Sequence, residues 1–266
     1  MKWSGLFGFR DQQDEPKPFL DHIEDLRWML IKSIAVLIIA MGVSFCFQNA
    51  LISLIMRPLH DIDLGPKGLM NTGIIDPLLI AIELSFYCGL IFSFPFIIFF
   101  LAEFILPALT PKEKRMLYPA SAASMGMFLL GAAFAYFVVL PQGLKYFFNY
   151  SKSLNFAPQW TVHEYFSFAT QFVLSFGLAF ELPLGVLILV KLGILSHATL
   201  QKTRSFAIVI ILFLSAIIMP APDVFSMLVM AVPMYILYEG CIWIAWYMER
   251  RERRQAASGS PKFTLE

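Results

Sequence analysis

The chain has 266 residues, of which 58% are hydrophobic and only 15% are charged, and its mean hydropathy is +0.70. A soluble domain carries about 25% charged residues because its surface must be hydrated, so the composition excludes a soluble globule of this size. The 20 Lys and Arg nearly balance the 19 Asp and Glu, which excludes a strongly basic nucleic-acid-binding protein. The sequence therefore predicts an all-α protein that crosses a membrane several times.

The sequence lacks the common motifs of enzymes and metal sites. It contains no GxxxxGK[ST] nucleotide-binding loop and no HExxH, GxSxG or CxxC motif. Its three cysteines, Cys46, Cys88 and Cys241, lie inside apolar runs without the spacing of a disulfide framework or a metal site. We therefore expect no enzymatic activity, no metal and no cofactor.

Six apolar segments are candidates for membrane-spanning helices, which need about 20 residues each. The fifth is short: Phe206 to Met219 would form a helix of about 21 Å, against a hydrocarbon core of about 30 Å. Such a span must thin the bilayer locally or depend on partners. Pro141 is expected to end the third span. The six predicted spans cover approximately residues 28–47, 78–105, 116–144, 165–190, 205–219 and 224–248.

Lys and Arg are distributed unevenly between the two sides that six spans would define. Sixteen of the 20 lie in the two termini and in the links after the second and fourth spans, and the remaining four are Arg57, Lys67, Lys145 and Lys152. Because positive residues concentrate on the cytoplasmic side, both termini are predicted to be cytoplasmic. The chain then divides into a cytoplasmic tail (1–17), a six-span membrane domain (18–248) and a basic cytoplasmic tail (249–266).

An amphipathic helix is predicted to run into the first span. Phe19, Ile23 and Leu26 recur at helical spacing, while Glu24 and Asp25 lie on other faces. Two interpretations stay open at this point. The helix could be a membrane-surface anchor whose acids are solvated, or its acids could bind a basic ligand at the membrane surface.

Three more acids are candidates for function. Glu181 lies deep in an apolar span, where a carboxylate costs about 2.5–3.5 kcal/mol, so it is expected to face a cavity or a partner or to bond to a neighbouring helix. No clear polar companion is evident at its depth. Asp223 follows Pro222 and is predicted first as the N-cap of the last helix. Glu113 has cations on both sides, which alone is typical of a surface ion pair.

Five segments, in this order along about residues 19–240, carry a combination of motifs that is specific as a set. Together they resemble TatC, the multispanning subunit of the twin-arginine protein translocase. The segments are Phe19-x-x-His22-x-x-x-Leu26-Arg27, Pro107-Ala-Leu-x-x-x-Glu113-Lys-Arg115, Phe134-Ala-Tyr-Phe-Val-Val-Leu-Pro141, Phe176-Gly-x-x-Phe180-Glu181-x-Pro183, and Pro222-Asp223-Val-Phe-Ser226 with Pro233-Met-Tyr beyond it.

The resemblance implies a function and a shape. It implies six helices around a concave, glove-like face in the bacterial inner membrane. It also implies a receptor for twin-arginine signal peptides that, with the single-span proteins TatA and TatB, exports folded proteins using the proton-motive force. Membrane lipid and further copies of the chain within a larger complex are the other expected partners, and nucleic acid is not.

The resemblance also assigns roles to individual residues. The implied signal-peptide site contains Asp25 and Glu113, with Glu24 beside Asp25 as an alternative because the family motif normally carries Glu where Asp25 stands. The same site includes His22, Arg27 and Phe104. Glu181 and Asp223 are implied intramembrane contacts to partner proteins, and Pro58 and Pro183 are implied structural residues.

Two other functions stay open from the residues alone. The first is an ion-coupled carrier of small solutes with Glu181 as its proton site. A carrier of this kind is expected to have paired broken helices and a cluster of polar residues at the membrane midplane. The second is a scaffold that assembles single-span proteins through the short hairpin of the fifth and sixth spans.

Overall fold

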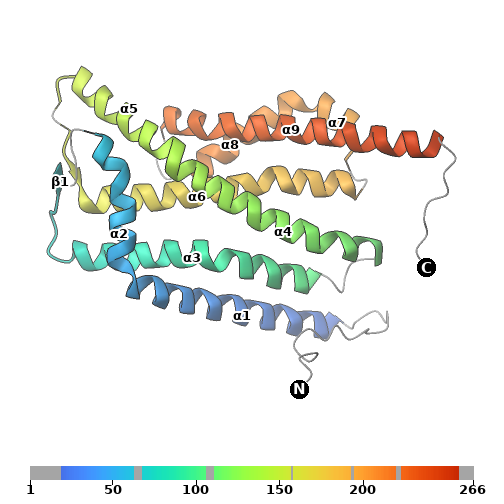
Figure 1. Cartoon of the computed structure of the whole chain (residues 1–266), viewed down its shortest axis with the longest axis horizontal. Coiled ribbons are helices and arrows are strands. Elements are labelled where there is room, and N and C mark those ends of the chain that lie inside the picture. Colours follow the sequence, from blue (N-terminus) through green and yellow to red (C-terminus); the bar gives the residue numbers. More distant parts are fainter. Residues whose placement is uncertain are drawn as a thin grey trace.

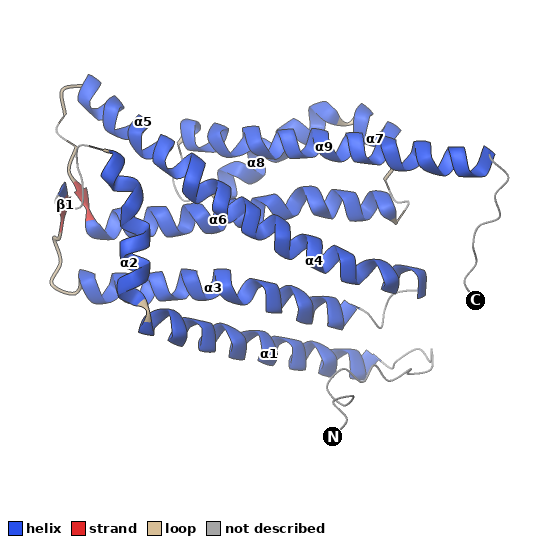
Figure 2. Cartoon of the chain, viewed as in Figure 1, coloured by secondary structure: helices blue, strands red, loops and turns tan. Residues whose placement is uncertain are grey.

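The structure is a computed structural model that describes residues 19–62, 68–105, 111–156, 158–192, 195–219 and 223–257. Within these ranges its regular elements are helices and two strands of two residues each (Figure 2). In chain order the elements are α1 (Phe19–Cys46), α2 (Gln48–Met56), η1 (Arg57–Asp61), β1 (Leu69–Met70), α3 (Asp76–Ile105), α4 (Pro111–Phe134), η4 (Ala135–Val139), α5 (Leu140–Ser153), β2 (Trp160–Thr161), α6 (Val162–Lys191), α7 (His197–Lys202), α8 (Arg204–Ile218) and α9 (Val224–Ala257).

The long helices lie side by side as a bundle, and α1 begins at the same end of the bundle at which α9 ends (Figure 1). We call this end the terminal end and the other the opposite end. All six predicted membrane helices are present. Five contain apolar stretches of 25 to 35 residues, long enough to cross a membrane. The predicted helix before the first span is also present, because α1 runs unbroken from Phe19 into that span.

Two predicted boundaries differ from the structure. The helix of the third span does not end at Pro141. It passes through η4, a π-helical turn in which the Leu140 N–H donates to the carbonyl of Ala135, and continues as α5. A proline normally clashes with the carbonyl four residues before it, and the wider π turn just ahead of Pro141 accommodates the ring. At the other boundary, α9 stays helical to Ala257, past the predicted end of the membrane domain at residue 248.

The short fifth span is confirmed as α8, whose 15 residues measure about 22 Å. Its end at Ile218 lies inside the bundle, where the last carbonyls of a helix lack intrahelical partners. The Ser175 hydroxyl of α6 donates to the Ile218 carbonyl at 2.9 Å. This bond ties the end of α8 to α6.

A cap of short elements, none of them among the predicted ones, covers the opposite end. In α2 and η1, Ile55 and Leu59 turn inward and are buried. The hydroxyls of Tyr136 and Tyr165 donate to the carbonyls of Leu54 and Ile55, at 2.6 and 2.5 Å, and so satisfy the last turn of α2. The strands β1 and β2 pair in parallel and join the two loops at this end.

The central helix is α6, which packs against α3, α4 and α9. Its approach to α4 is close because glycines face aromatic rings. A Cβ at Gly131 would lie 2.8 Å from the carbonyl oxygen of Phe176 and 2.7 Å from Phe180, and one at Gly177 would lie 2.7 Å from Phe128. In lipid, helices gain little from apolar burial, so such close packing is what holds them together.

Adding one methyl group at this contact should therefore destabilise the protein. We expect Gly131→Ala to lower the free energy of unfolding by about 1–3 kcal/mol, because a backbone carbonyl cannot yield as a flexible side chain can. Gly126, on the same helix, is the matched control, because a Cβ added there would have nothing within 4 Å. Gly126→Ala should leave stability unchanged or raise it by up to about 1 kcal/mol. Thermal unfolding in a mild detergent measures the stability of both variants. Equal melting temperatures for Gly131→Ala and Gly126→Ala would contradict the close packing at Gly131.

Candidate functional site

At the terminal end, the first turns of α1 pack against the last turn of α3. The His22 and Phe104 rings stack with centroids 4.5 Å apart and planes inclined by 18°. Further along α1, Lys32 Nζ lies 3.4 Å from Glu103 Oε2 and 5.7 Å from the centre of the Phe100 ring. Two residues predicted in one site, His22 and Phe104, are thus brought together although they are distant in sequence.

The structure distinguishes the two acids of α1. Asp25 is half-buried and follows His22 by three residues, on the stripe of α1 that packs against α3. Glu24 and Arg27 are exposed. Of the two acids, Asp25 is therefore the one on the same face as the His22–Phe104 stack.

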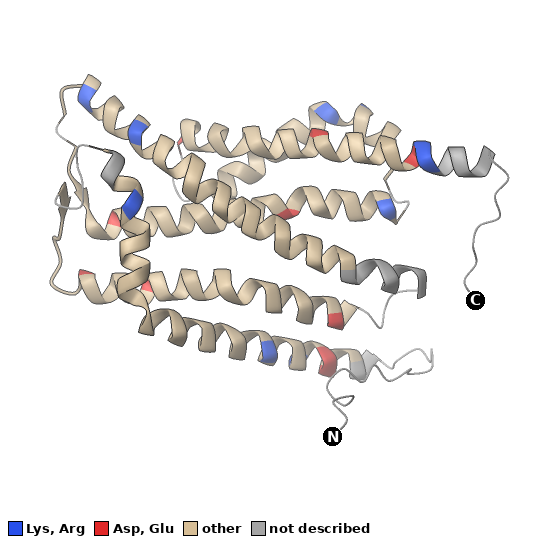
Figure 3. Ribbon diagram, viewed as in Figure 1, with Lys and Arg blue, Asp and Glu red and all other residues tan. Residues whose placement is uncertain are grey.

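The structure describes only the backbone of Glu113, the other predicted acid of this site. Glu113 is the third residue of α4, which begins at Pro111 at the terminal end (Figure 1). Its side chain lies outside the described residues, so the predicted proximity of Asp25 and Glu113 stays a prediction. Figure 3 shows the charged residues gathered toward the ends of the helices, with few between them.

Glu181 lies in the contact between α6 and α4. It is half-buried, and the buried Ser124 hydroxyl donates to its Oε2 at 2.7 Å. The expectation that Glu181 lacks a polar companion is therefore wrong, because Ser124, 57 positions away, is brought to the same depth by the packing of α4. Its other oxygen, Oε1, is buried and has no hydrogen-bond partner among the described residues. Glu181 can thus accept or donate one more hydrogen bond.

The remaining predicted residues have structural contacts. The Asp223 carboxylate accepts from the Ser226 N–H at 2.8 Å, so the predicted N-cap of the last helix is confirmed. Pro58 is buried in η1. Pro183 is buried within α6, and the Cys241 thiol of α9 donates to its carbonyl at 3.3 Å.

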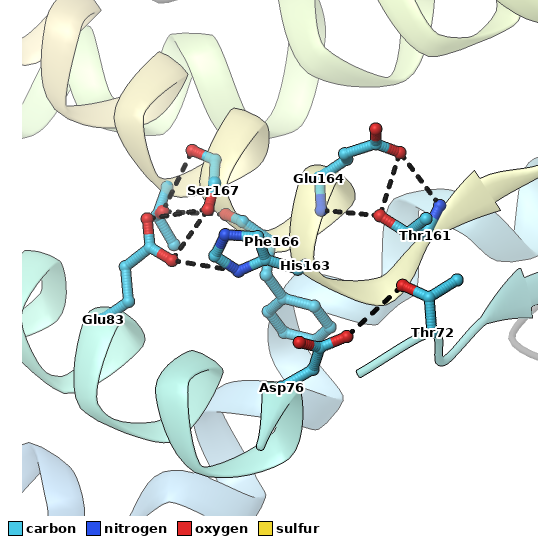
Figure 4. A network of polar contacts seen from close by, with 9 residues as sticks. Thr72, Asp76, Glu83, Thr161, His163, Glu164, Phe166 and Ser167 are labelled. Atoms are coloured by element: carbon cyan, nitrogen blue, oxygen red, sulfur yellow. Dashed lines mark hydrogen bonds and ion pairs between the residues drawn. The ribbon is translucent and has the colours of Figure 1, made fainter. Parts of the chain in front are cut away.

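One polar network was not predicted. The Ser167 hydroxyl of α6 lies 2.7 Å from both carboxylate oxygens of Glu83 on α3, and His163 Nδ1 lies 3.6 Å from Glu83 Oε2 (Figure 4). Close by, Thr161 and Glu164 form a capping box that begins α6. The signal in the sequence was Glu83 itself, an acid within an apolar run. Within the described residues, no group of three or more His, Cys, Asp or Glu side chains could hold a metal ion.

Comparison with known proteins shows the family of the chain. The family model for the Sec-independent protein translocase protein TatC matches residues 21–233. The chain belongs to the TatC family. Two crystal structures of the twin-arginine translocase receptor TatC, one of them in DDM, superpose with TM-scores of 0.73 and 0.71 at 35% identity. The two superpositions include 84% and 85% of this chain, and 99% and 98% of the respective crystal structures.

Curated TatC proteins of several bacteria are also similar. The Akkermansia muciniphila protein is 46% identical over 185 residues, which is 70% of this chain but only 53% of that longer relative. The TatC proteins of Deinococcus radiodurans and Aquifex aeolicus are 36% and 35% identical, over 84% and 89% of this chain and 83% and 98% of their own lengths. The predicted TatC resemblance and the all-α, multi-pass membrane fold are thereby confirmed. The small-solute carrier finds no support in these relatives.

Proposed function

We propose that the protein is the receptor and core subunit of a twin-arginine translocase. In this role it binds twin-arginine signal peptides and, with TatA and TatB, exports folded proteins at the expense of the proton-motive force. The observation that carries the proposal is the superposition on the twin-arginine translocase receptor over nearly the whole of that chain, at 35% identity. The role is non-enzymatic, and we expect several copies to act within a larger complex.

The signal-peptide site is proposed at the terminal end, around the His22–Phe104 stack. A pair of guanidinium groups needs carboxylates that accept two parallel hydrogen bonds each. Asp25 lies beside the stack on the packed face of α1, and Glu113 lies in the first turn of α4 at the same end. Glu24, exposed on the neighbouring face, can reinforce the negative potential. Arg27 then faces the outer side of α1, toward lipid headgroups or the peptide backbone.

Export of a twin-arginine reporter tests the function and this site together. In a bacterial strain lacking its own TatC but expressing cognate TatA and TatB, the wild-type chain should restore export of a folded twin-arginine reporter. Substituting Glu24, Asp25 and Glu113 by Ala together should abolish it. Each lost charge-assisted bond is worth about 1.5–3 kcal/mol, so crosslinking of the signal peptide should fall about tenfold or more per carboxylate.

Glu103 provides the matched control, because it is an exposed acid at the same end that is already paired with Lys32. Glu103→Ala should bind and export like the wild type. Loss of binding in this control would mean that general negative potential, and not the three named acids, attracts the peptide. A stable, inserted wild-type chain that restores no export would refute the proposed function.

We propose that the terminal end faces the cytoplasm of a bacterial inner membrane, as the Lys and Arg distribution predicts. A membrane-impermeant thiol reagent applied to whole cells should then label a cysteine placed at Asp63 or Asn155 on a background without the natural cysteines. It should not label one placed at Lys112 or Ser258 unless the cells are opened. The reverse labelling would put Asp25 and Glu113 on the wrong side for a receptor of cytoplasmic signal peptides.

Glu181 is proposed to contact a polar side chain of a TatA or TatB helix, with Asp223 a further contact at the opposite end. The support is its free oxygen, Oε1, which needs one more partner inside the membrane. Glu181→Gln keeps the shape and the hydrogen-bonding capacity, so export should remain close to that of the wild type. Glu181→Ala keeps neither and should export far less, with signal-peptide binding unchanged in both. Equal loss in Gln and Ala would require an ionisable group, and normal export by the Ala variant would exclude the contact.

A further inference from the structure

A second polar site lies at the terminal end, away from α1 and α3. It is a cavity of about 330 Å³ between α7, the start of α8 and the later part of α9. This volume is at the small end of the range for ligand sites. Its polar and aromatic lining consists of His197, Gln201, Arg204, Glu239, Trp243 and Trp246.

Two of the lining residues, Arg204 and Glu239, form an ion pair in which each group keeps an atom that is unpartnered among the described residues. Arg204 Nη2 donates to Glu239 Oε1 across the α8–α9 contact. The Nε of Arg204 and the Oε2 of Glu239 are also buried, and neither has a hydrogen-bond partner within the part of the chain that the structure describes. The two side chains as a whole are still 38% and 29% exposed, so a ligand in the cavity that supplies one acceptor and one donor together can bond to both charged groups.

The one Arg and the one Glu that line the cavity balance each other in charge. Arg204 and Glu239 cancel each other. In the next turns of α9, Glu249 accepts from the His197 N–H at 2.7 Å, while Arg250 lies 4.9 Å from the centre of the Trp246 ring. A site without net charge fits a zwitterion better than an anion, and its indole rings can also receive a cation.

The position of the cavity along the helices indicates a lipid. Glu239 follows Val224 by 15 positions, or about 23 Å of helix, so it lies inside the thickness of a hydrocarbon core of about 30 Å. The adjacent helix α8 is too short to span that core and must draw the headgroup layer inward. Trp243 and Trp246 are 68% and 43% exposed, as tryptophans at the membrane–water interface often are.

We propose that this cavity binds the headgroup of an aminophospholipid, phosphatidylethanolamine, from the leaflet at the terminal end. A phosphate oxygen accepts from the Arg204 guanidinium, and the primary ammonium donates to the Glu239 carboxylate while lying against the exposed indoles. Phosphatidylcholine has the same charges but no N–H to donate. Phosphatidylglycerol can donate through its hydroxyls but brings an uncompensated negative charge beside Glu239.

Lipid retention tests the site directly and independently of export. The full chain is purified from nanodiscs that contain equal amounts of phosphatidylethanolamine, phosphatidylcholine and phosphatidylglycerol, and bound lipids are counted by native mass spectrometry. The wild type should retain phosphatidylethanolamine over phosphatidylcholine by about tenfold, the effect expected of one charge-assisted hydrogen bond. Glu239→Gln should bring this ratio close to one, and Lys191→Gln, an exposed cation at the same end, should leave it unchanged.

Replacing both charges keeps the test independent of folding. Arg204→Gln with Glu239→Gln leaves no unpaired charge, so this variant should fold and show no preference among the three lipids. A wild type that prefers phosphatidylglycerol or has no preference, or a Glu239→Gln variant that keeps the wild-type ratio, would overturn the proposal. Equal thermal stabilisation by free phosphoethanolamine and by the lipid would overturn it too, because the site would then serve a soluble ligand.

Discussion

The structure depends on α6, because this helix makes a polar contact with nearly every other layer of the bundle. Lipid tails are as apolar as leucine, so membrane helices associate through close packing and interhelical hydrogen bonds and not through apolar burial. Side chains of α6 or its carbonyls bond to α2, α3, α4, α8 and α9, through Tyr165, Ser167, Glu181, Ser175 and Pro183. Each bond is worth only about 0.6–2 kcal/mol in a membrane. Together they fix the position of α6 relative to these five helices.

The predictions from sequence succeeded where a property is local. Apolar runs, the short fifth span and the cap by Asp223 follow from composition and from neighbouring residues, and all were found. They failed where the deciding partner is distant along the chain. Ser124 could not be assigned to Glu181, nor Ser167 to Glu83, because each pairing depends on how α6 packs against another helix. The π turn before Pro141 was missed for a related reason, since proline normally ends a helix and a wider turn is a rare alternative.

The candidate receptor site was predictable only in part. The resemblance to TatC implied His22 and Phe104 as members of this site, and the structure brings their rings into contact. The sequence left the choice between Glu24 and Asp25 open. Helical geometry now separates them, because three residues along a helix return to the same face whereas two do not. Asp25 therefore follows His22 onto the packed stripe, and Glu24 points away from it. A change of one position therefore decides which acid shares the face of α1 that packs against α3.

Glu181 and the Arg204–Glu239 pair share a feature that separates them from the structural contacts of the bundle. Ser167, Ser175 and Tyr165 complete their hydrogen bonds within the chain, so packing explains them fully. Glu181, Arg204 and Glu239 each keep a buried polar atom without a partner among the described residues. Selection for stability alone would replace such groups by apolar ones, which insert into a membrane more readily. Their incomplete bonding is explained if the missing partner comes from outside the chain, a protein helix at Glu181 and a lipid headgroup at Arg204 and Glu239.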